Sequence, residues 1–214
     1  MVLKIIEDTY SLALQTVIRS KSTEKEQLRD ALLKLGNKVG IDISADNMLT
    51  KSEVVTPMEQ VFQGYLFSDS LNLVYSTKDD YQYFARGISL AIPNSMQGYF
   101  DFQGVRGLDA LTQPIRAVSH PPVNEKANVD TVIVAKAVLA TGCTAISLAR
   151  NIVSKYQPKH LIIASALYSH RGVSELLEEL PIIKFIYTVG RPDALDENGM
   201  LIPGVGNLDN RLSL

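Results

Sequence analysis

Residues 131–152 read T-V-I-V-A-K-A-V-L-A-T-G-C-T-A-I-S-L-A-R-N-I, and this stretch decides the fold. The β-branched run Val132–Val134 predicts a buried strand, and apolar residues recur at helical spacing from Ile146 onward. Small and hydroxyl residues at 139–144 predict a tight loop between the two. A helix N-terminus leaves backbone N–H groups unpaired, so this loop can bind a phosphate. The alternative is an ordinary strand–helix turn in which Thr144 caps the helix.

The regular pattern continues to the C-terminus. Residues 161–167 and 182–189 read as buried strands, and residues 171–180 read as a helix between them. Strands that alternate with helices predict a parallel α/β sheet. Ligands of such sheets bind at the carboxyl ends of the strands, where the loop 139–144 lies. A second tight loop, Pro203–Gly206, follows near the end of the chain.

The first part of the chain is less regular. Residues 1–50 predict two packing helices, the second ending near Gly36 or Gly40 because glycine often terminates a helix. Residues 51–76 predict β structure, and 77–93 predict a loop and a helix. Residues 94–127 carry many glycines and prolines, which favours a flexible binding loop or a β-arm that pairs with another subunit. These two interpretations are compatible.

Composition bounds the function. The 214 residues predict one domain, and a formal net charge of −2 gives no basic footprint for nucleic acid. The single cysteine, Cys143, rules out an internal disulfide framework, and no apolar run is long enough to span a membrane. We therefore expect a cytoplasmic protein with small-molecule ligands, and neither nucleic acid nor membrane as partner.

Two motifs carry a resemblance to a known family. V-L-A-T-G-C-T-A at 138–145 and L-I-P-G-V-G-N-L-D-N-R at 201–211 lie about sixty residues apart, as a βαβ spacing allows. They resemble the D-P-M-L-A-T-G-G-S loop and the C-terminal Y-I-(I/V)-P-G-L-G-D-A-G-D-R segment of uracil phosphoribosyltransferases. L-R-D-A-L-L-K-L-G at 28–36 and V-V-T-P-M at 54–58 extend the resemblance toward the N-terminus.

The resemblance implies a type I phosphoribosyltransferase-like fold, in which helices flank a parallel sheet that carries a small hood and a β-arm. A single domain would span 1–214, with the arm or flexible loop at 94–127 and the core, phosphate loop and hood at 130–214. The implied reaction transfers a phosphoribosyl group from phosphoribosyl pyrophosphate to uracil, giving UMP and pyrophosphate. The family uses Mg²⁺ and forms dimers or higher oligomers, so a homodimer is expected.

The matched motifs also imply site residues. The 5-phosphate would be held by Ala140, Thr141, Gly142, Cys143 and Thr144. The base would be met by Met200, Leu201, Ile202, Gly204 and Gly206. The catalytic positions would be Arg106, Lys136 and Asn207.

Several of these positions depart from the family pattern. Lys136 replaces an acid that accepts hydrogen bonds from ribose hydroxyls, and Asn207 and Asn210 replace two aspartates. An amide is a weaker ligand than a carboxylate for a hard cation, so these changes weaken the case for Mg²⁺ and we assign no metal-binding residue. Lys136 would either contact phosphate and partly replace the charge of the metal, or point to solvent.

Further departures leave alternatives open. Met200 replaces a tyrosine, and Cys143 replaces a glycine, which would strain the loop if that glycine has a positive φ and would otherwise be a small apolar filler. The family's R-A-G loop fits better at Ser76–Lys78 than at Ala85–Gly87. Two other functions therefore remain: a catalytically impaired paralogue that binds a nucleotide or phosphate ligand, and a phosphoribosyltransferase for another base.

Overall fold

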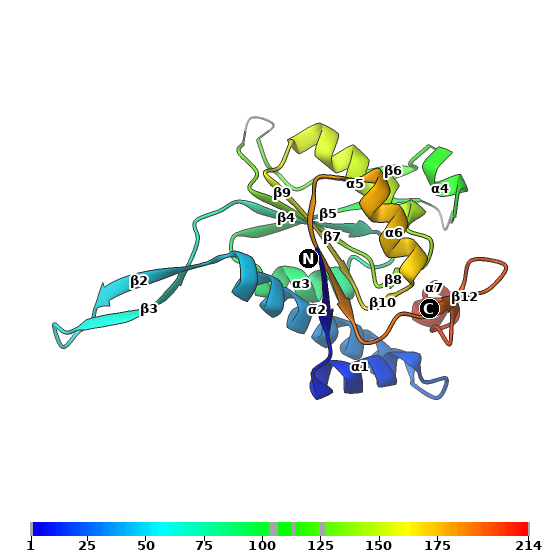
Figure 1. Cartoon of the computed structure of the whole chain (residues 1–214), viewed down its shortest axis with the longest axis horizontal. Coiled ribbons are helices and arrows are strands. Elements are labelled where there is room, and N and C mark those ends of the chain that lie inside the picture. Colours follow the sequence, from blue (N-terminus) through cyan, green and yellow to red (C-terminus); the bar gives the residue numbers. More distant parts are fainter. Residues whose placement is uncertain (1, 103–106, 113, 125–126, 214) are drawn as a thin grey trace.

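A central sheet organises the chain. The computed structural model describes residues 2–102, 107–112, 114–124 and 127–213, and within them seven strands form a sheet in the order β1-β11-β9-β7-β4-β5-β6 (Figure 1). The strands are β1 (Leu3–Ile6), β4 (Asn72–Thr77), β5 (Ser95–Asp101), β6 (Ala117–Ser119), β7 (Thr131–Ala135), β9 (His160–Ser165) and β11 (Ile183–Val189). All neighbours pair in parallel except β5 and β6. The expected α/β class is confirmed.

Helices cover both faces of this sheet (Figure 1). One face carries α1 (Thr9–Arg19), α2 (Lys25–Asn47) and α3 (Phe84–Ala91), and the other carries α5 (Cys143–Tyr156) and α6 (His170–Glu179), with α4 (Asp109–Thr112) beside α5.

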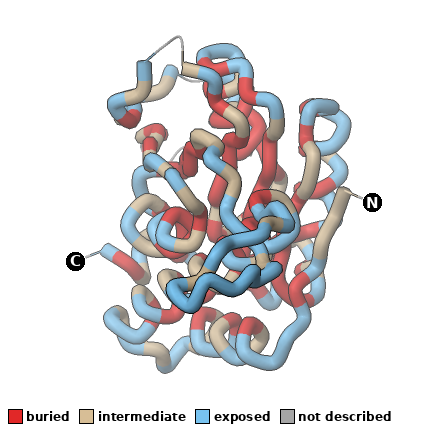
Figure 2. The backbone as a smooth tube through the Cα atoms, turned by 90° about the vertical axis from the view of Figure 1, so that its left-hand side faces the viewer, coloured by how far each residue is buried: buried red, intermediate tan, exposed pale blue. Residues whose placement is uncertain are grey.

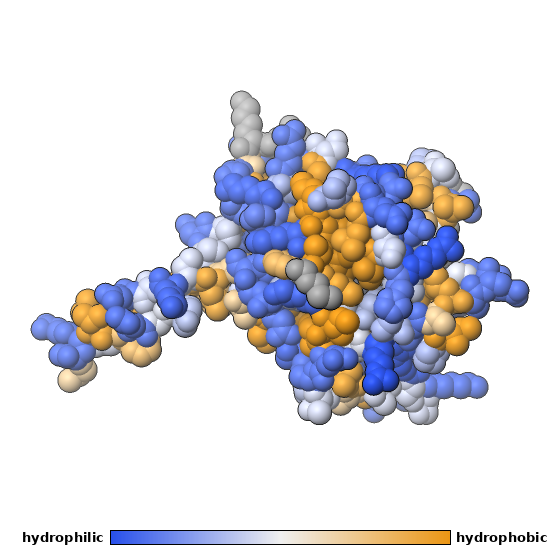
Figure 3. All heavy atoms as spheres, in the orientation of Figure 1, coloured by the Kyte–Doolittle hydropathy of each residue, from blue (hydrophilic) through white to orange (hydrophobic). Residues whose placement is uncertain are grey.

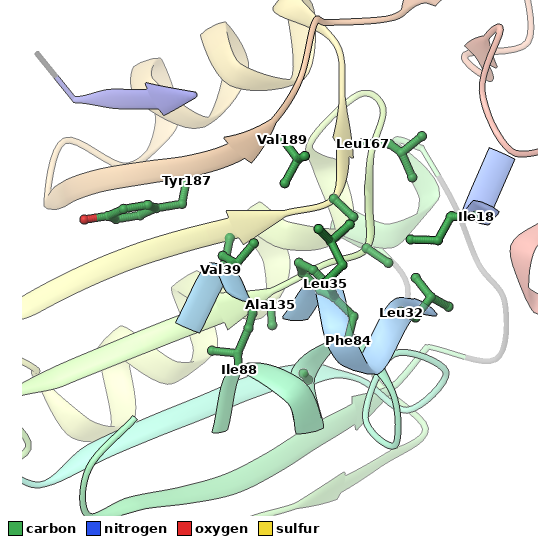
Figure 4. Packing of buried hydrophobic residues seen from close by; sticks show 14 of the residues in the cluster. Ile18, Leu32, Leu35, Val39, Phe84, Ile88, Ala135, Leu167, Tyr187 and Val189 are labelled. Atoms are coloured by element: carbon green, nitrogen blue, oxygen red, sulfur yellow. The ribbon is translucent and has the colours of Figure 1, made fainter. Parts of the chain in front are cut away.

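The core divides into two buried clusters, one on each face of the sheet. Along β7, Ile133 and Ala135 belong to the first cluster, whereas Val132 and Val134 belong to the second, as the two-residue period of a strand requires. Figure 4 shows the first cluster, where side chains from α2 and α3 gather around Ala135. The sheet is therefore buried on both sides, in keeping with its continuous apolar strands (Figure 2).

One expectation for the N-terminal part was wrong. Residues 1–50 are mostly helical as expected, although Leu3–Ile6 forms the edge strand β1. The second helix does not end at Gly36 or Gly40 but continues to Asn47. A Cβ at Gly36 would collide with the carbonyl oxygen of Phe84. This glycine therefore allows α2 and α3 to cross closely and does not mark the end of a helix.

The projecting arm also lies elsewhere than expected. It is a hairpin of β2 (Leu49–Val55) and β3 (Val61–Phe67), which extends away from the body of the molecule (Figure 1) and is largely exposed (Figure 2). Within 94–127, in contrast, β5 and β6 belong to the central sheet. Residues 51–76 do form β structure as predicted.

Short elements at the carboxyl ends of the strands form the hood. The strands β8 (Val138–Leu139) and β10 (Leu167–Tyr168) pair in parallel, and β12 (Ala194–Leu195) pairs with β13 (Leu201–Ile202) before α7 (Leu208–Leu212). Of the two placements of the R-A-G loop, Ala85–Gly87 lies inside α3, and in the preferred placement Ser76 and Thr77 still belong to β4, so that only Lys78 lies beyond the strand. None of the helices in the described ranges combines the length and the apolar character that a membrane span requires.

Candidate functional site

The loop between β8 and α5 has the geometry of an anion cradle. Gly142 is the residue before the helix and has a φ of +81°, a conformation that favours glycine. A Cβ there would lie 2.9 Å from the carbonyl oxygen of Gly172, so the loop is also packed closely against α6. Cys143 is the first residue of α5, is buried, and is not among the residues with positive φ. The condition for strain at Cys143 is therefore not met, in keeping with its interpretation as a small apolar filler.

Ser169 connects this loop to α6 by hydrogen bonds. Its hydroxyl caps α6 by accepting a hydrogen bond from the backbone N–H of Gly172 at 2.9 Å, and it donates to the carbonyl of Ala140 at 2.6 Å. The backbone N–H of Ser169 donates to the carbonyl of Leu139 at 3.1 Å. One residue thus joins the start of α6 to the phosphate loop, which holds the N–H groups of α5 in place.

The loop near the C-terminus is fastened to α1. Arg19 forms a bidentate ion pair with the buried carboxylate of Asp193, at 2.8 and 2.9 Å. The same guanidinium donates to the carbonyl of Gly204 at 3.0 Å, and the N–H of Gly204 donates to Asp193 at 3.2 Å. Both backbone groups of Gly204 are therefore engaged within the fold.

The two loops line one cavity of about 160 Å³. The turn at Gly199 comes close to Thr141, since a Cβ on that glycine would lie 3.2 Å from the Thr141 methyl group. The predicted residues that line the cavity are Lys136, Ala140, Thr141, Gly142, Cys143, Thr144, Met200, Leu201 and Gly206. The phosphate loop and the C-terminal loop thus share a side of the sheet.

Three predicted residues are not among the described residues that line it. Ile202 is half exposed, and Gly204 is buried with its backbone groups bound to Arg19 and Asp193. Asn207 is exposed, and its side chain caps α7 by accepting from the N–H of Asn210 at 3.1 Å. Arg106 lies outside the described residues.

Lys136 does not point to solvent. Its ammonium lies 2.6 Å from a carboxylate oxygen of Asp80, which is 4% exposed and also accepts a hydrogen bond from the Thr77 hydroxyl at 3.0 Å. Burial alone would lower the pKa of Lys136, but Asp80, with Asp209 and Asp79 nearby, raises it above its ordinary value. Lys136 is therefore a charged ammonium in the cavity at neutral pH, in contact with one carboxylate and near two others.

Two carboxylates, Asp79 and Asp209, line the same cavity. Burial raises the pKa of Asp79, and the charge of Asp209 raises it further, whereas Lys136 opposes both. Within the described part of the chain, no three His, Cys, Asp or Glu side chains are grouped so that they could hold a metal ion. The Lys136 ammonium lies 2.6 Å from Asp80, and its positive charge disfavours a divalent cation at the same place.

Asp79, Asp80 and Asp209 were missed in the sequence. Asp79-Asp80 follows β4 after one residue, Lys78. A pair of acids just after a buried strand was a usable signal, because parallel strands end at the ligand-binding edge. Asp209 lies within the 201–211 motif, at a position where the family has glycine. Ser169 gave no local signal, because its contact with Ala140 joins residues 29 positions apart.

Comparison with known proteins identifies relatives of this chain. A family model for uracil phosphoribosyltransferase matches residues 112–213. A uracil phosphoribosyltransferase of Sulfurisphaera tokodaii is 30% identical over 220 residues, covering 99% of each chain. One from Thermococcus gammatolerans is also 30% identical, over 96% of this chain and 89% of the relative, and one from Sulfolobus acidocaldarius is 28% identical over 99% of each.

A solved structure shares the fold. The AQ2163 protein from Aquifex aeolicus superposes with a TM-score of 0.79 over 98% of this chain and 97% of that one, at 22% sequence identity. At that identity the likeness concerns the fold alone.

Proposed function

The chain belongs to the uracil phosphoribosyltransferase family, and we propose that it transfers the phosphoribosyl group of phosphoribosyl pyrophosphate to uracil, giving UMP and pyrophosphate. One observation carries the proposal. The loop that begins α5 and the loop 198–206 line the same cavity, so a phosphate bound at one loop and a base bound at the other can belong to one nucleotide.

The phosphate loop supplies the anion site. Backbone N–H groups at the start of α5 lack intrahelical partners, and the helix dipole favours negative charge there. Thr141 and Thr144 line the cavity beside these groups, and their hydroxyls can donate to phosphate oxygens. The 5-phosphate would thus be held without any basic side chain in the loop itself.

The base would lie against the C-terminal loop. Met200, Leu201 and Gly206 line the cavity, and the Met200 side chain is apolar, so uracil would be recognised mainly through backbone groups. The bidentate pair of Arg19 and Asp193 holds this loop on α1. Base recognition then depends on how firmly the loop is fastened rather than on a dedicated polar side chain.

A turnover assay tests the proposal. Purified protein is incubated with phosphoribosyl pyrophosphate and labelled uracil, with and without Mg²⁺, and UMP is measured by chromatography. We expect UMP in the wild type and a loss of at least about tenfold in Thr141→Ala, because a hydrogen bond to a charged group is removed. Ser154→Ala, on the part of α5 remote from the cavity, is the control. Absence of UMP in both buffers would overturn the catalytic proposal, and retained UMP binding would then favour a ligand-binding paralogue.

We also propose that the arm makes the protein a homodimer. β2 and β3 pair only with each other among the described strands, and their apolar side chains are exposed, including Val55 at 72% and Tyr65 at 64%. Figure 3 shows apolar side chains interspersed with polar ones along this projection. Exposed apolar groups of this number mark an interaction surface, and a second copy of the chain is the partner that always accompanies it.

A further inference from the structure

Lys136 lies where the family resemblance places an acid. Both its backbone and its side chain are held by other parts of the fold. Its backbone N–H donates to the carbonyl of Ala164 at 2.9 Å, between β7 and β8. Its ammonium is held by Asp80 at 2.6 Å, and Asp80 is in turn fixed by Thr77. The lysine lines the same cavity as Thr141 and Thr144 of the phosphate loop.

We propose that Lys136 binds the phosphate oxygens of a diphosphate-bearing ligand directly, without a bridging divalent cation, and that Asp80 is the positioning residue that holds its ammonium there. This inference rests on the proposed function and specifies how the site takes its phosphoribosyl donor. The sequence alone suggested only that Lys136 replaces part of the charge of the metal. The inference adds that Asp80 is the carboxylate that holds the lysine, and that diphosphate binding does not require Mg²⁺.

The chemistry of the group supports this role. A lysine ammonium has three N–H donors, and among the described residues Asp80 is its hydrogen-bond acceptor, so donors remain for a ligand. Asp209 and Asp79 lie near enough to raise its pKa, which keeps the ammonium charged. A diphosphate that enters the cavity would therefore meet a fixed positive charge among the carboxylates that would otherwise repel it.

Calorimetric titration of the full chain with inorganic pyrophosphate tests the inference, once in EDTA and once in Mg²⁺. We expect the wild type to bind in both buffers, with dissociation constants within about threefold of each other. Lys136→Met should weaken binding in EDTA about 10- to 100-fold, the range for a hydrogen bond between charged groups. Lys136→Asp, which restores an acid, should bind only when Mg²⁺ is present. Wild-type binding that requires Mg²⁺ and is unchanged in Lys136→Met would overturn the inference.

Matched variants exclude a folding defect. Lys159→Met removes another lysine of a 2.6 Å ion pair, with Asp130 and outside the cavity, and should bind like the wild type. Lys136→Met leaves the buried Asp80 carboxylate without its cation, so the double variant Lys136→Met/Asp80→Asn removes that charge and should also bind weakly in EDTA. Normal pyrophosphate binding by the double variant would contradict the inference.

Titration with UMP separates the two proposals. UMP carries the base and one phosphate, so it tests the shared cavity and not the diphosphate contact. If the protein binds UMP but binds pyrophosphate only with Mg²⁺, the proposed function stands and the role of Lys136 is contradicted. If the protein binds neither ligand in either buffer, both the proposed function and the role of Lys136 are contradicted.

Discussion

Gly142 is the residue on which the phosphate loop turns. Its φ of +81° strains any residue with a side chain, and a Cβ there would press on Gly172 at 2.9 Å. We therefore expect Gly142→Ala to lower the free energy of unfolding by about 2–3 kcal/mol, the sum of backbone strain and a forced shift of α6. Urea denaturation measures this loss.

A substitution at Gly107 separates the cost of backbone strain from the cost of the contact with α6. Gly107 also has a positive φ, of +61°, but apart from its chain neighbours no heavy atom of the described residues lies within 4 Å of the position its Cβ would take. Gly107→Ala should therefore cost only the backbone term, about 1 kcal/mol. Equal losses in the two variants would show that the contact between the loop and α6 contributes nothing.

The crossing of α2 and α3 depends on glycines in both helices. In an exposed helix, Gly→Ala stabilises by about 1 kcal/mol. At Gly36 the added methyl group would meet the backbone of Phe84, so we expect the opposite sign, with a loss of about 2–3 kcal/mol in urea denaturation. Ala45→Gly, at an exposed position of the same helix, calibrates the intrinsic preference. A stabilised Gly36→Ala would contradict the close crossing.

The attachment of the C-terminal loop to α1 gives a second prediction. Arg19→Met leaves the Asp193 carboxylate, which is 4% exposed, without its cation, and the carbonyl of Gly204 loses its hydrogen-bond donor. We expect stability to fall by about 2–3 kcal/mol and UMP binding to weaken. The double variant Arg19→Met/Asp193→Leu removes the buried charge and should recover stability but not UMP affinity. Recovery of both would show that the loop needs no such anchor.

The helices and strands also show which features of the fold could be predicted from the sequence. The strands around Thr131 and Leu161 and the helix from Cys143 were predicted well, because the periodicity of apolar residues is a local signal. The alternative in which Thr144 caps this helix was wrong, since Gly142 is the N-cap and Thr144 lies inside α5. Gly36 was misread as a helix end because its reason lies in α3, some fifty residues away. The partner of Lys136 was missed for the same cause, since Asp80 lies 56 positions earlier in the chain.

The whole molecule pairs a buried body with an exposed arm. The body buries both faces of its sheet, whereas the β2–β3 hairpin leaves apolar side chains in solvent. Alternate residues of a strand share a face, so Val61 and Tyr65 lie on one face of the hairpin together with their cross-strand partners Val55 and Lys51. An arm of this kind gains stability only when a second surface covers it, which is the reason to expect a dimer.

The dimer can be tested without unfolding the body. Val61 and Tyr65 are 66% and 64% exposed, so Val61→Ser/Tyr65→Ser should change the stability of a monomer by about 0.5 kcal/mol or less. If the arm is the interface, sedimentation equilibrium should show the dimer dissociation constant rising about 30-fold or more, since buried aromatic anchors contribute about 2 kcal/mol or more each. Leu108→Ser removes an apolar side chain that is 75% exposed on the body, and should leave the constant unchanged. A wild type that sediments as a monomer, or a double variant that dimerises as tightly as the wild type, would contradict the assignment of the arm.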